Sequence, residues 1–384
     1  MKRLLLTCCL VLITQNVYSQ ILWEINYDSA PRSPASAILK TDSNFLVGTG
    51  DMRILKFDAN GNYNGLFYQL PNNDAFWTSL DISDNKIIGH GGSPGYNIFY
   101  NIIDSTGNQV NYYNVSSGQS GSGDVIVVNN NTYMLWASNC CGMGQTWDME
   151  IKKFSGLSNS AVWNTPICFS CNTSLGSCHM GSDYPSDLSW NNNMLIASAD
   201  LVSSPCSPSG YLVAIDTNGV KLWDYTETAF ESRYIKSVPL GVSDILVAGQ
   251  KYISPNRRMF ASKFDSNGNL IWTTDVITNM EVRTTDLLLI NDSIALIYGI
   301  TYNGIFAALI NSSGQIIKQQ EFFTSQTPMM YDNGPNYNTQ VLKVAQDTFV
   351  GVYNYGQWYN STYFSLLSFT FFDSIYGCTD SLAL

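Results

Sequence analysis

Short apolar runs separated by polar turns recur along the whole chain. Seven of them are continuously apolar over three to six residues, some ending in glycine, at residues 45–48, 87–89, 133–136, 194–197, 245–249, 294–299 and 349–352. Such runs predict strands that are buried on both faces. Their period is about 50 residues, with a longer interval between the third and fourth runs. This period predicts a repeat protein in which each unit packs only on its neighbours.

A hairpin signal follows six of the seven runs. An apolar strand ends in Asp, Asn or Ser, a glycine-containing turn follows, and a second apolar strand begins, at residues 54–62, 100–108, 151–156, 212–219, 262–268 and 308–314. In such turns the side-chain oxygen accepts backbone hydrogen bonds and glycine takes a positive φ. The Asp-x-Asn-Gly sequence also resembles part of a calcium loop. The spaced carboxylates and the closing Glu of those loops are missing, so we interpret these segments as turns.

A further short strand precedes each apolar run, as in residues 37–40 and 287–290. Each unit therefore has four strands, two inner ones followed by the two of the hairpin. Four strands are the content of one propeller blade. Packed between adjacent blades, the apolar runs would be covered on both faces.

The last unit lacks a clear fourth strand. Residues 363–369 are a plausible third strand, and the chain then reaches Gly377. Residues 21–27 have the pattern of the outer strands at 221–225 and 270–273. We therefore predict an all-β, seven-bladed β-propeller over residues 20–376, in which the N-terminal strand completes the last blade. Closure of the ring removes an open sheet edge.

The first 19 residues have the features of a secretory signal peptide. Lys2 and Arg3 precede an apolar run at residues 4–13, and a polar segment ends at Ser19. The alternative is a lipoprotein leader, because Cys8 and Cys9 lie near the start, but both cysteines fall inside the apolar run. No later run is long enough to cross a membrane. We expect a soluble protein that is secreted or held at the cell surface.

Composition agrees with many short strands and excludes one class of partner. Charged residues and aromatic residues each make up 13% of the chain, a balance unlike that of a helical bundle or a disordered tail. The chain exceeds the usual size of a single core and has no Pro-rich or charged linker, which again favours repeats. The net charge of −11 becomes −13 when the two basic leader residues are lost. Nucleic acid is therefore not an expected partner, and we expect a soluble monomer.

Residues 214–223, with the sequence Ala-Ile-Asp-Thr-Asn-Gly-Val-Lys-Leu-Trp, resemble the PQQ-like repeat of quinoprotein-like propellers. In that family the Trp docks one blade on the next. The fourth and fifth units match well, whereas the first, second and sixth lack the Trp. The resemblance implies the fold and not an activity. Residues 377–380, Gly-Cys-Thr-Asp, resemble the opening of short C-terminal modules in secreted Bacteroidota proteins. We therefore expect residues 377–384 to begin a truncated C-terminal module.

Six cysteines cluster in the third and fourth units, at Cys140, Cys141, Cys168, Cys171, Cys178 and Cys206. An even number of cysteines in an exported protein indicates disulfides. The loops that hold them join second to third strands or one blade to the next, so they share one face of the disc. A zinc site at Cys168, Cys171, Cys178 and His179 would need reduced thiolates. Adjacent Cys140 and Cys141 resemble a vicinal disulfide of some quinoprotein dehydrogenases, but the acidic calcium site of those larger rings does not map here. We expect no metal and no cofactor.

The same face carries the candidate binding residues. They combine aromatic rings with polar groups, namely Trp147, Asp183, Tyr252, Arg257, Arg258, Tyr355, Trp358 and Tyr359. Exposed rings supply apolar contact area and the polar groups supply direction, as sugar or peptide recognition requires. Packing between blades would explain some of these aromatic residues equally well.

No catalytic residues are assigned. The two histidines, His90 and His179, fall in different units and no nucleophile-elbow motif is present. Carboxylates for glycoside cleavage are available at Asp51, Asp148, Asp183, Glu227, Glu231 and Glu281, although solvated loop charges explain them too. The first hypothesis is a non-catalytic propeller that recognises a glycan or a protein, or acts as a scaffold. The second is a glycan-active enzyme, which would need two carboxylates about 5 to 9 Å apart in the central depression.

Overall fold

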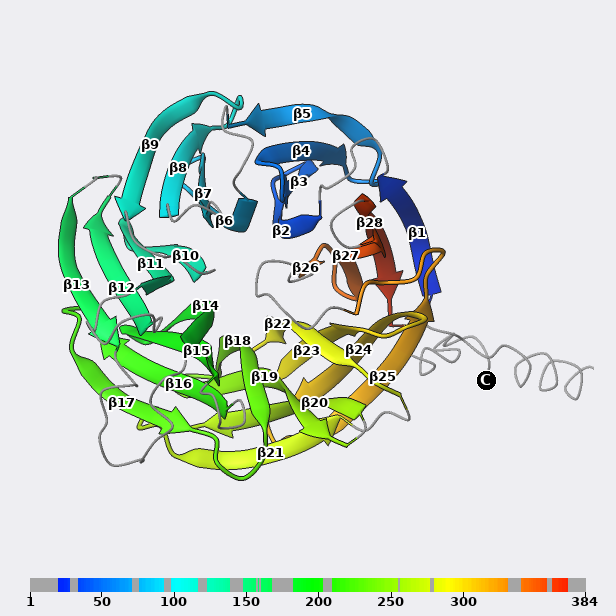
Figure 1. Ribbon diagram of the computed structural model, residues 1–384. Coiled ribbons are helices and arrows are strands. Elements are labelled where there is room, and N and C mark those ends of the chain that lie inside the picture. Colours follow the sequence, from blue (N-terminus) through cyan, green and yellow to red (C-terminus); the bar gives the residue numbers. More distant parts are fainter. Residues whose placement is uncertain are drawn as a thin grey trace, which may run out of the picture.

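The chain folds as a ring of seven β-sheets (Figure 1). The computed structural model describes residues 20–27, 34–70, 76–92, 98–116, 123–138, 148–156, 158, 160–167, 182–202, 209–254, 256–276, 280–330, 340–357 and 361–371. All helices and strands that are assigned among the described residues are β-strands; no helix occurs among them. Each sheet has four antiparallel strands, and the sheets are arranged around a common axis. The prediction of an all-β, seven-bladed propeller is confirmed.

The first three blades use their strands in chain order, from the axis outward. Blade 1 consists of β2 (Ala35–Lys40), β3 (Asn44–Thr49), β4 (Arg53–Asp58) and β5 (Tyr63–Gln69). Blade 2 consists of β6 (Phe76–Ser83), β7 (Lys86–Gly92), β8 (Ile98–Asp104) and β9 (Gln109–Ser116). Blade 3 consists of β10 (Gly123–Val128), β11 (Asn131–Ser138), β12 (Asp148–Ser155) and β13 (Ala161–Ile167).

The next three blades repeat that order. Blade 4 consists of β14 (Ser182–Asn191), β15 (Met194–Val202), β16 (Ser209–Asp216) and β17 (Lys221–Thr226). Blade 5 consists of β18 (Ser232–Leu240), β19 (Asp244–Ile253), β20 (Asn256–Phe264) and β21 (Leu270–Val276). Blade 6 consists of β22 (Arg283–Asn291), β23 (Ile294–Ile300), β24 (Gly304–Asn311) and β25 (Ile316–Phe323).

Blade 7 is assembled from both ends of the described chain. It consists of β26 (Val341–Lys343), β27 (Thr348–Gln357), β28 (Ser361–Thr370) and, outermost, β1 (Gln20–Tyr27). β1 pairs antiparallel with β28, so that Ile21 lies opposite Phe369 and Tyr27 opposite Phe364. The N-terminal strand therefore closes the ring as predicted. The edge that β28 would otherwise present to solvent is paired.

The apolar runs form the second strand of every blade and are buried on both faces. In β19, Leu246 and Val247 both have an exposed fraction of 0%. Because successive side chains point to opposite faces of a sheet, Leu246 packs in a cluster with Leu287 of blade 6. Val247 instead packs in a cluster with Ile196 of blade 4. A continuous apolar sequence is thus what a sheet between two neighbouring blades requires.

A tryptophan on the outer strand docks one blade on the hairpin turn of the next. The indole Nε1 of Trp223 in blade 4 donates a hydrogen bond to the backbone oxygen of Ser266 in blade 5, at 2.9 Å. Gly268 of that turn has a φ of +81°, and a Cβ there would lie 2.6 Å from the Trp223 ring. Equivalent Trp–Gly contacts join Trp163 to Gly219, Trp272 to Gly314 and Trp23 to Gly61. The closing strand therefore supplies this contact to blade 1.

The Asp-x-Asn-Gly segments are turns, as expected. Asp216 Oδ1 accepts the backbone N–H groups of Asn218 and Val220, both at 2.8 Å. The same two bonds recur at the other turns of this kind, with Asp58, Asp104, Asp265 and Asn311 as acceptors. Hydrogen bonds from the Thr106 side chain and the Asn108 backbone, the largest of several, lower the pKa of Asp104 to about 2. Both oxygens of the four Asp carboxylates accept hydrogen bonds from within their own turns.

Candidate functional site

The innermost strands surround the propeller axis, and each has one edge with no neighbouring strand (Figure 1). Backbone N–H groups on such an edge need acceptors if they are shielded from water. One position on each innermost strand, or directly before it in blade 7, is placed to supply an acceptor to the following blade. We call the residues at this position the axial ring: Ala37, Ser79, Asp124, Asp187, Lys236, Asp286 and Gln340.

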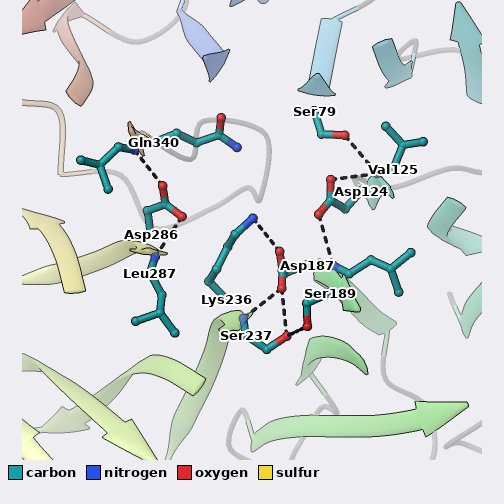
Figure 2. A network of polar contacts seen from close by, with 12 residues as sticks. Ser79, Asp124, Val125, Asp187, Ser189, Lys236, Ser237, Asp286, Leu287 and Gln340 are labelled. Atoms are coloured by element: carbon teal, nitrogen blue, oxygen red, sulfur yellow. Dashed lines mark hydrogen bonds and ion pairs between the residues drawn. The ribbon is translucent and has the colours of Figure 1, made fainter. Parts of the chain in front are cut away.

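The axial ring links neighbouring blades by one recurring hydrogen bond (Figure 2). Asp124 Oδ2 accepts the backbone N–H of Leu188 at 3.2 Å. Asp286 Oδ2 accepts that of Val341 at 2.7 Å. The same bond has Ser79, Asp187 and Gln340 as acceptors and Val125, Ser237 and Ile38 as donors. In each case the donor is the residue that follows the ring position of the next blade.

Two ring positions depart from this rule for a chemical reason. Ala37 has no polar side-chain atom, and the ammonium of Lys236 can only donate. Lys236 Nζ instead forms an ion pair with Asp187 Oδ1 at 2.7 Å, directed back toward blade 4 (Figure 2). Lys236 therefore cannot accept the backbone N–H of Leu287 in blade 6. Asp286 Oδ1 accepts this N–H instead, at 2.9 Å.

Burial sets the protonation of the ring carboxyls. It raises the pKa of Asp187 to about 6, although the charge of Lys236 opposes the rise. Burial likewise raises the pKa of Asp286 to about 6. For Lys236, burial would lower the pKa, but the charges of Asp187, Asp124 and Asp286 together raise it. The ammonium stays charged while the two carboxyls titrate near pH 6. Their oxygens are engaged by backbone or ammonium groups, so the ring acts chiefly in joining the blades.

A second concentration of charge lies on the opposite side of the strands from the glycine turns. We call this side the loop face. On this side each second strand ends and each third strand begins, and the innermost strand of each blade begins. Three arginines stand at the loop-face ends of blades 5 and 6, on β18, β20 and β22. They are Arg233, Arg257 and Arg283, which we call the arginine cluster.

Contacts between blades 5 and 6 hold the arginine cluster in place. The N–H of Val282 donates to the backbone oxygen of Arg257 at 3.2 Å. Thr284 Oγ1 donates to the backbone oxygen of Gly249 at 2.7 Å. Arg283 lies between these two bonds in the chain, so its backbone is fixed against blade 5. Its side chain is only 10% exposed.

Acidic side chains accompany the arginines. Arg233 Nε lies 3.0 Å from Asp200 Oδ2 of blade 4, and an Arg283 terminal nitrogen lies 3.4 Å from Glu281 Oε1. Burial lowers the pKa of Arg257 and the charge of Arg233 lowers it further. Burial and the charge of Arg257 lower the pKa of Arg283 in the same way. Burial is the larger cause for both residues, and the neighbouring guanidinium group adds to it.

The carboxyl of Asp200, beside this cluster, has a raised pKa. Burial raises its pKa to about 7, although Arg233 and Arg257 both act in the opposite direction. Only 6% of the residue is exposed. Burial thus favours the protonated form of this carboxyl, and the ion pair with Arg233 favours the ionised form.

The predicted binding residues divide into three groups. Tyr252 is 44% exposed and pairs through its backbone with Arg257, while Arg258 pairs with Lys251, so these three residues gather on blade 5. Tyr355 is buried at 7% exposure and packs against Tyr353 and Tyr363. The backbone of Asp183 pairs with Leu201. The side chain of Asp183 lies outside the described residues, as do Trp147, Trp358 and Tyr359.

The predicted cysteine site cannot be placed, because all six cysteines, Cys140, Cys141, Cys168, Cys171, Cys178 and Cys206, lie outside the described residues. The same holds for His179, for Cys378, for the predicted signal peptide and for residues 377–384. No group of three or more His, Cys, Asp or Glu side chains that could hold a metal occurs within the described ranges. None of the described residues forms a helix that could span a membrane.

The candidate carboxylates are dispersed. Asp51 forms an ion pair with Arg53 in blade 1. Glu227 is 3% exposed and accepts the backbone N–H of Ala229 at 2.8 Å. Glu231 is exposed, whereas Glu281 is partly buried beside Arg283. The side chains of Asp148 and Asp183 lie outside the described part of the chain.

His90 is a core residue. It is 1% exposed, and Nδ1 lies 2.5 Å from Thr78 Oγ1. Burial lowers its pKa to about 3, so the imidazole is neutral.

Sequence reasoning missed Arg233, Arg283 and Asp200. A compositional signal for the first two was present. The chain has seven arginines, and four lie within one stretch of about 50 residues: Arg3, Arg32 and Arg53 come earlier, and Arg233, Arg257, Arg258 and Arg283 form the group. The signal for Asp200 was absent, because nothing in the sequence of β15 places its carboxyl against a strand of blade 5.

Many solved structures are similar to this chain, including the following two. BamB from Moraxella catarrhalis is 15% identical, with a TM-score of 0.46, over 92% of this chain and 98% of that one. The computationally designed Ika8 protein is 11% identical, with a TM-score of 0.46, over 88% of this chain and 97% of that one. No protein-family model and no curated protein matches the chain. The fold assignment therefore rests on the sheet order described above.

Proposed function

We propose that this chain is a non-catalytic, monomeric recognition propeller that binds a glycan or protein ligand on its loop face. The observation that carries the proposal is the gathering of Tyr252, Arg257 and Arg258 with Arg233 and Arg283 at one place on that face. An exposed ring beside guanidinium groups offers apolar area and directed donors, which are the features of binding hot spots. The described ring carboxyls at the axis, by contrast, are engaged in joining blades.

Secretion to the medium or the cell surface is part of the proposal. It is supported by the charge and apolar run of residues 1–19. A Bacteroidota-type origin is supported by the Gly-Cys-Thr-Asp sequence at 377–380. Membership of the quinoprotein-like repeat propellers is supported by the Trp–turn contacts, in which Trp163, Trp223 and Trp272 donate to turn oxygens.

Binding is tested with the mature protein on glycan and peptide arrays. The variant Tyr252→Ala/Arg257→Gln removes a ring and a guanidinium from the loop face. A matched control is Val242→Ala, since Val242 is 86% exposed on the opposite, turn-bearing face. Binding that the loop-face variant loses and the control retains supports the proposal. Loss of binding in the control variant alone would contradict it.

The same material tests the competing enzyme hypothesis. Glu227 and Glu231, between blades 4 and 5, and Glu281, between blades 5 and 6, are described candidate carboxylates on the loop face. Release of reducing ends from a bound glycan, abolished by Glu231→Gln, would replace recognition by hydrolysis as the function. N-terminal sequencing of the exported protein tests the predicted cleavage after Ser19.

A further inference from the structure

The rim of blades 1 to 3 differs in charge from the rest of the rim. The outer strands β5, β9 and β13 follow one another around it (Figure 1), and they contain no Asp, Glu, Lys, Arg or His. The outer strands of blades 4 to 7 each carry at least one charged residue, namely Lys221, Asp224, Asp275, Lys318, Glu321 and Glu24. Charged side chains normally dominate a protein surface. The uncharged outer strands therefore suit a partner that has no charge to be matched.

Tyr112 of β9 presents a supported aromatic ring on this part of the rim. Its ring stacks on Phe99, with the centroids 5.6 Å apart and the planes 25° apart. Phe99 is buried and packs in a cluster with Leu46 of blade 1, so Tyr112 faces that blade. The exposed fraction of Tyr112 is nevertheless 39%. A ring held in place beneath and open to water above supplies apolar contact area at little cost in conformational entropy.

A buried polar network holds the amide of Gln109 on the same side of β9. Gln109 Oε1 accepts the hydroxyl of Tyr68 in blade 1 at 2.7 Å, and this hydroxyl accepts Asn101 Nδ2 at 2.7 Å. Tyr68 and Asn101 are both buried, and Asn101 lies directly opposite Tyr112 in the β8–β9 ladder. Gln109 itself is exposed. Among the described residues nothing accepts a hydrogen bond from its Nε2 group, so two fixed N–H donors are open to a ligand.

The buried network is unfavourable for packing alone. Within the described part of the chain, the buried Oδ1 atom of Asn101 has no hydrogen-bond partner, and such an atom disfavours folding. The equivalent position, three residues before the turn acceptor, holds Leu55, Val213 and Ala308 in blades 1, 4 and 6. The fold therefore does not require an amide there. What the amide of Asn101 adds is the fixed position of Tyr68 and, through it, of Gln109.

We propose that the rim between blades 1 and 2 binds a sugar unit of an uncharged glycan. The C–H face of the sugar packs on Tyr112, and its hydroxyl groups bond to the amides of Gln109 and Asn114. Asn114 is exposed and lies two residues after Tyr112, on the same side of the strand. We call Gln109, Tyr112 and Asn114 the rim site. It is separate from the loop face and goes beyond the proposed function.

The chemistry of the rim site favours a neutral sugar over other partners. A sugar hydroxyl both donates and accepts, as an amide group does, and a pyranose adds an apolar face for the ring. An anionic polysaccharide would find no cation on β5 or β9 and would meet a chain with a net charge of −11. Protein interfaces commonly use Arg and charged pairs, which these strands lack. A proline-rich peptide also stacks on tyrosine rings, so it serves as a competing probe.

The test follows the side chains of the rim site in the mature protein by NMR. The tyrosine ring ¹³C signals and the glutamine side-chain ¹⁵N signals are assigned with Tyr112→Phe and Gln109→Met. The neutral probes are cellohexaose, laminarihexaose, mannohexaose, maltohexaose and chitohexaose, each added to about 10 mM. Hexagalacturonate and blocked hexaproline are the charged and peptide probes. We expect at least one neutral hexasaccharide to shift the Tyr112 and Gln109 signals and to leave the ring signal of Tyr252 unchanged.

Variants separate stacking from positioning. Tyr112→Ala is expected to weaken binding at least about tenfold, because the stacking surface is lost. Tyr112→Phe keeps the ring and should bind like the parent. Asn101→Leu should weaken binding about two- to tenfold, because Gln109 must then be ordered by the ligand, while its unfolding temperature stays equal or rises. The matched control Tyr252→Ala removes a similarly exposed tyrosine from the loop face and should bind like the parent.

Several outcomes would overturn the inference: no shift of the Tyr112 and Gln109 signals with any neutral hexasaccharide, equal shifts with hexagalacturonate or hexaproline, unchanged binding in Tyr112→Ala, or equal weakening in Tyr252→Ala. Binding by Asn101→Leu at the parent's affinity would show that the buried network only packs the blades. The proposed function depends on Tyr252 and Arg257, whereas the rim site depends on Tyr112. Each of the two proposals therefore stands or falls without the other.

Discussion

The side-chain oxygen of Gln340 accepts the backbone N–H of Ile38 at 2.9 Å, although 302 positions separate the two residues in the chain. This bond joins blade 7 to blade 1 at the axis. Farther out, Asn354 makes two bonds with the backbone of Ala35, at 2.7 and 2.9 Å. At the rim, Trp23 packs on the turn of Gly61. The seam of the ring is therefore bonded at three distances from the axis.

Lys236 is the one cation of the axial ring, and its removal should be costly. In Lys236→Met the carboxylate of Asp187 would lose its ion pair while remaining buried, which costs roughly 3 kcal/mol of unfolding free energy. Asp187→Asn in the same background should recover part of the loss. Denaturant unfolding of the two single variants and the double variant measures the coupling. The exposed pair Lys221–Asp224 is the control, and Lys221→Met should change stability by less than about 1 kcal/mol. Equal effects of the two lysine variants would contradict the assignment.

The titration of Asp286 should give stability a distinct pH dependence. Its folded-state pKa of about 6 lies above the ordinary value of 3.8, so between these values the folded protein binds more protons than the unfolded one. Protonation of Asp286 therefore adds to the free energy of unfolding as the pH falls from 7.5 to 4.5. At most about 3 kcal/mol of this contribution is lost when the pH rises again. Lys236 and Asp187, which face Asp286, enter this balance.

The readout is the difference between the parent and Asp286→Asn. The variant lacks one hydrogen-bond acceptor at every pH, and it has no titrating carboxyl at this position. The stability advantage of the parent should therefore be larger at pH 4.5 than at pH 7.5, in denaturant unfolding at both values. A measurement above pH 4.5 also keeps the turn carboxylates, such as Asp104 with its pKa near 2, ionised. An advantage that is constant or grows with pH would show that Asp286 is ionised throughout.

The blade count and the closing strand followed from local sequence because the signals are local. A run such as residues 245–249 has to be apolar on both faces, and a turn such as 216–219 has to carry an acceptor and a glycine. These requirements act within a few residues, so one sequence displays them. The family resemblance predicts that Trp223 docks one blade on the next, and the structure adds its hydrogen-bond partner, Ser266.

The axial ring and the arginine cluster were out of reach for a different reason. Asp187 and Ser237 are 50 residues apart, and neither stands out within its own strand. Tyr355 illustrates a second limit. The sequence allows either an exposed ring on the loop face or packing between blades. β27 extends through Tyr355 to Gln357, and its ring lies in the cluster between blades 6 and 7. An aromatic residue near a strand end carries no sequence mark that separates surface from core.

The Trp–Gly contacts predict a penalty for a side chain in the turn. Gly268→Ala would force a left-handed backbone on alanine and would place its Cβ 2.6 Å from the Trp223 ring. We expect a loss of about 2 to 3 kcal/mol, larger than the backbone cost alone. Gly241→Ala separates the two causes, because Gly241 has a φ of +64° and only one backbone oxygen, at 3.9 Å, near its Cβ position. It should lose about 1 kcal/mol. Equal losses of stability for Gly268→Ala and Gly241→Ala in thermal unfolding would mean that the Trp223 ring moves aside without an energetic cost.

Removal of the closing strand β1 should open the ring. A peptide with the sequence of β1 should then be able to close it again. A chain that begins at Pro34 lacks β1, so the edge of β28 is exposed and Tyr27 no longer stacks on Phe364, whose ring centroid lies 5.1 Å away. We expect a lower unfolding temperature and self-association through the unpaired edge. A synthetic peptide of residues 20–33 should bind the truncated protein and raise its unfolding temperature toward that of the parent, because it restores the main-chain pairing and the Trp23 contact. The same peptide with Trp23→Ala should bind more weakly. A truncated protein that stays monomeric and unfolds at the parent's temperature would show that the ring is closed by the axis contacts of Gln340 and Asn354 alone.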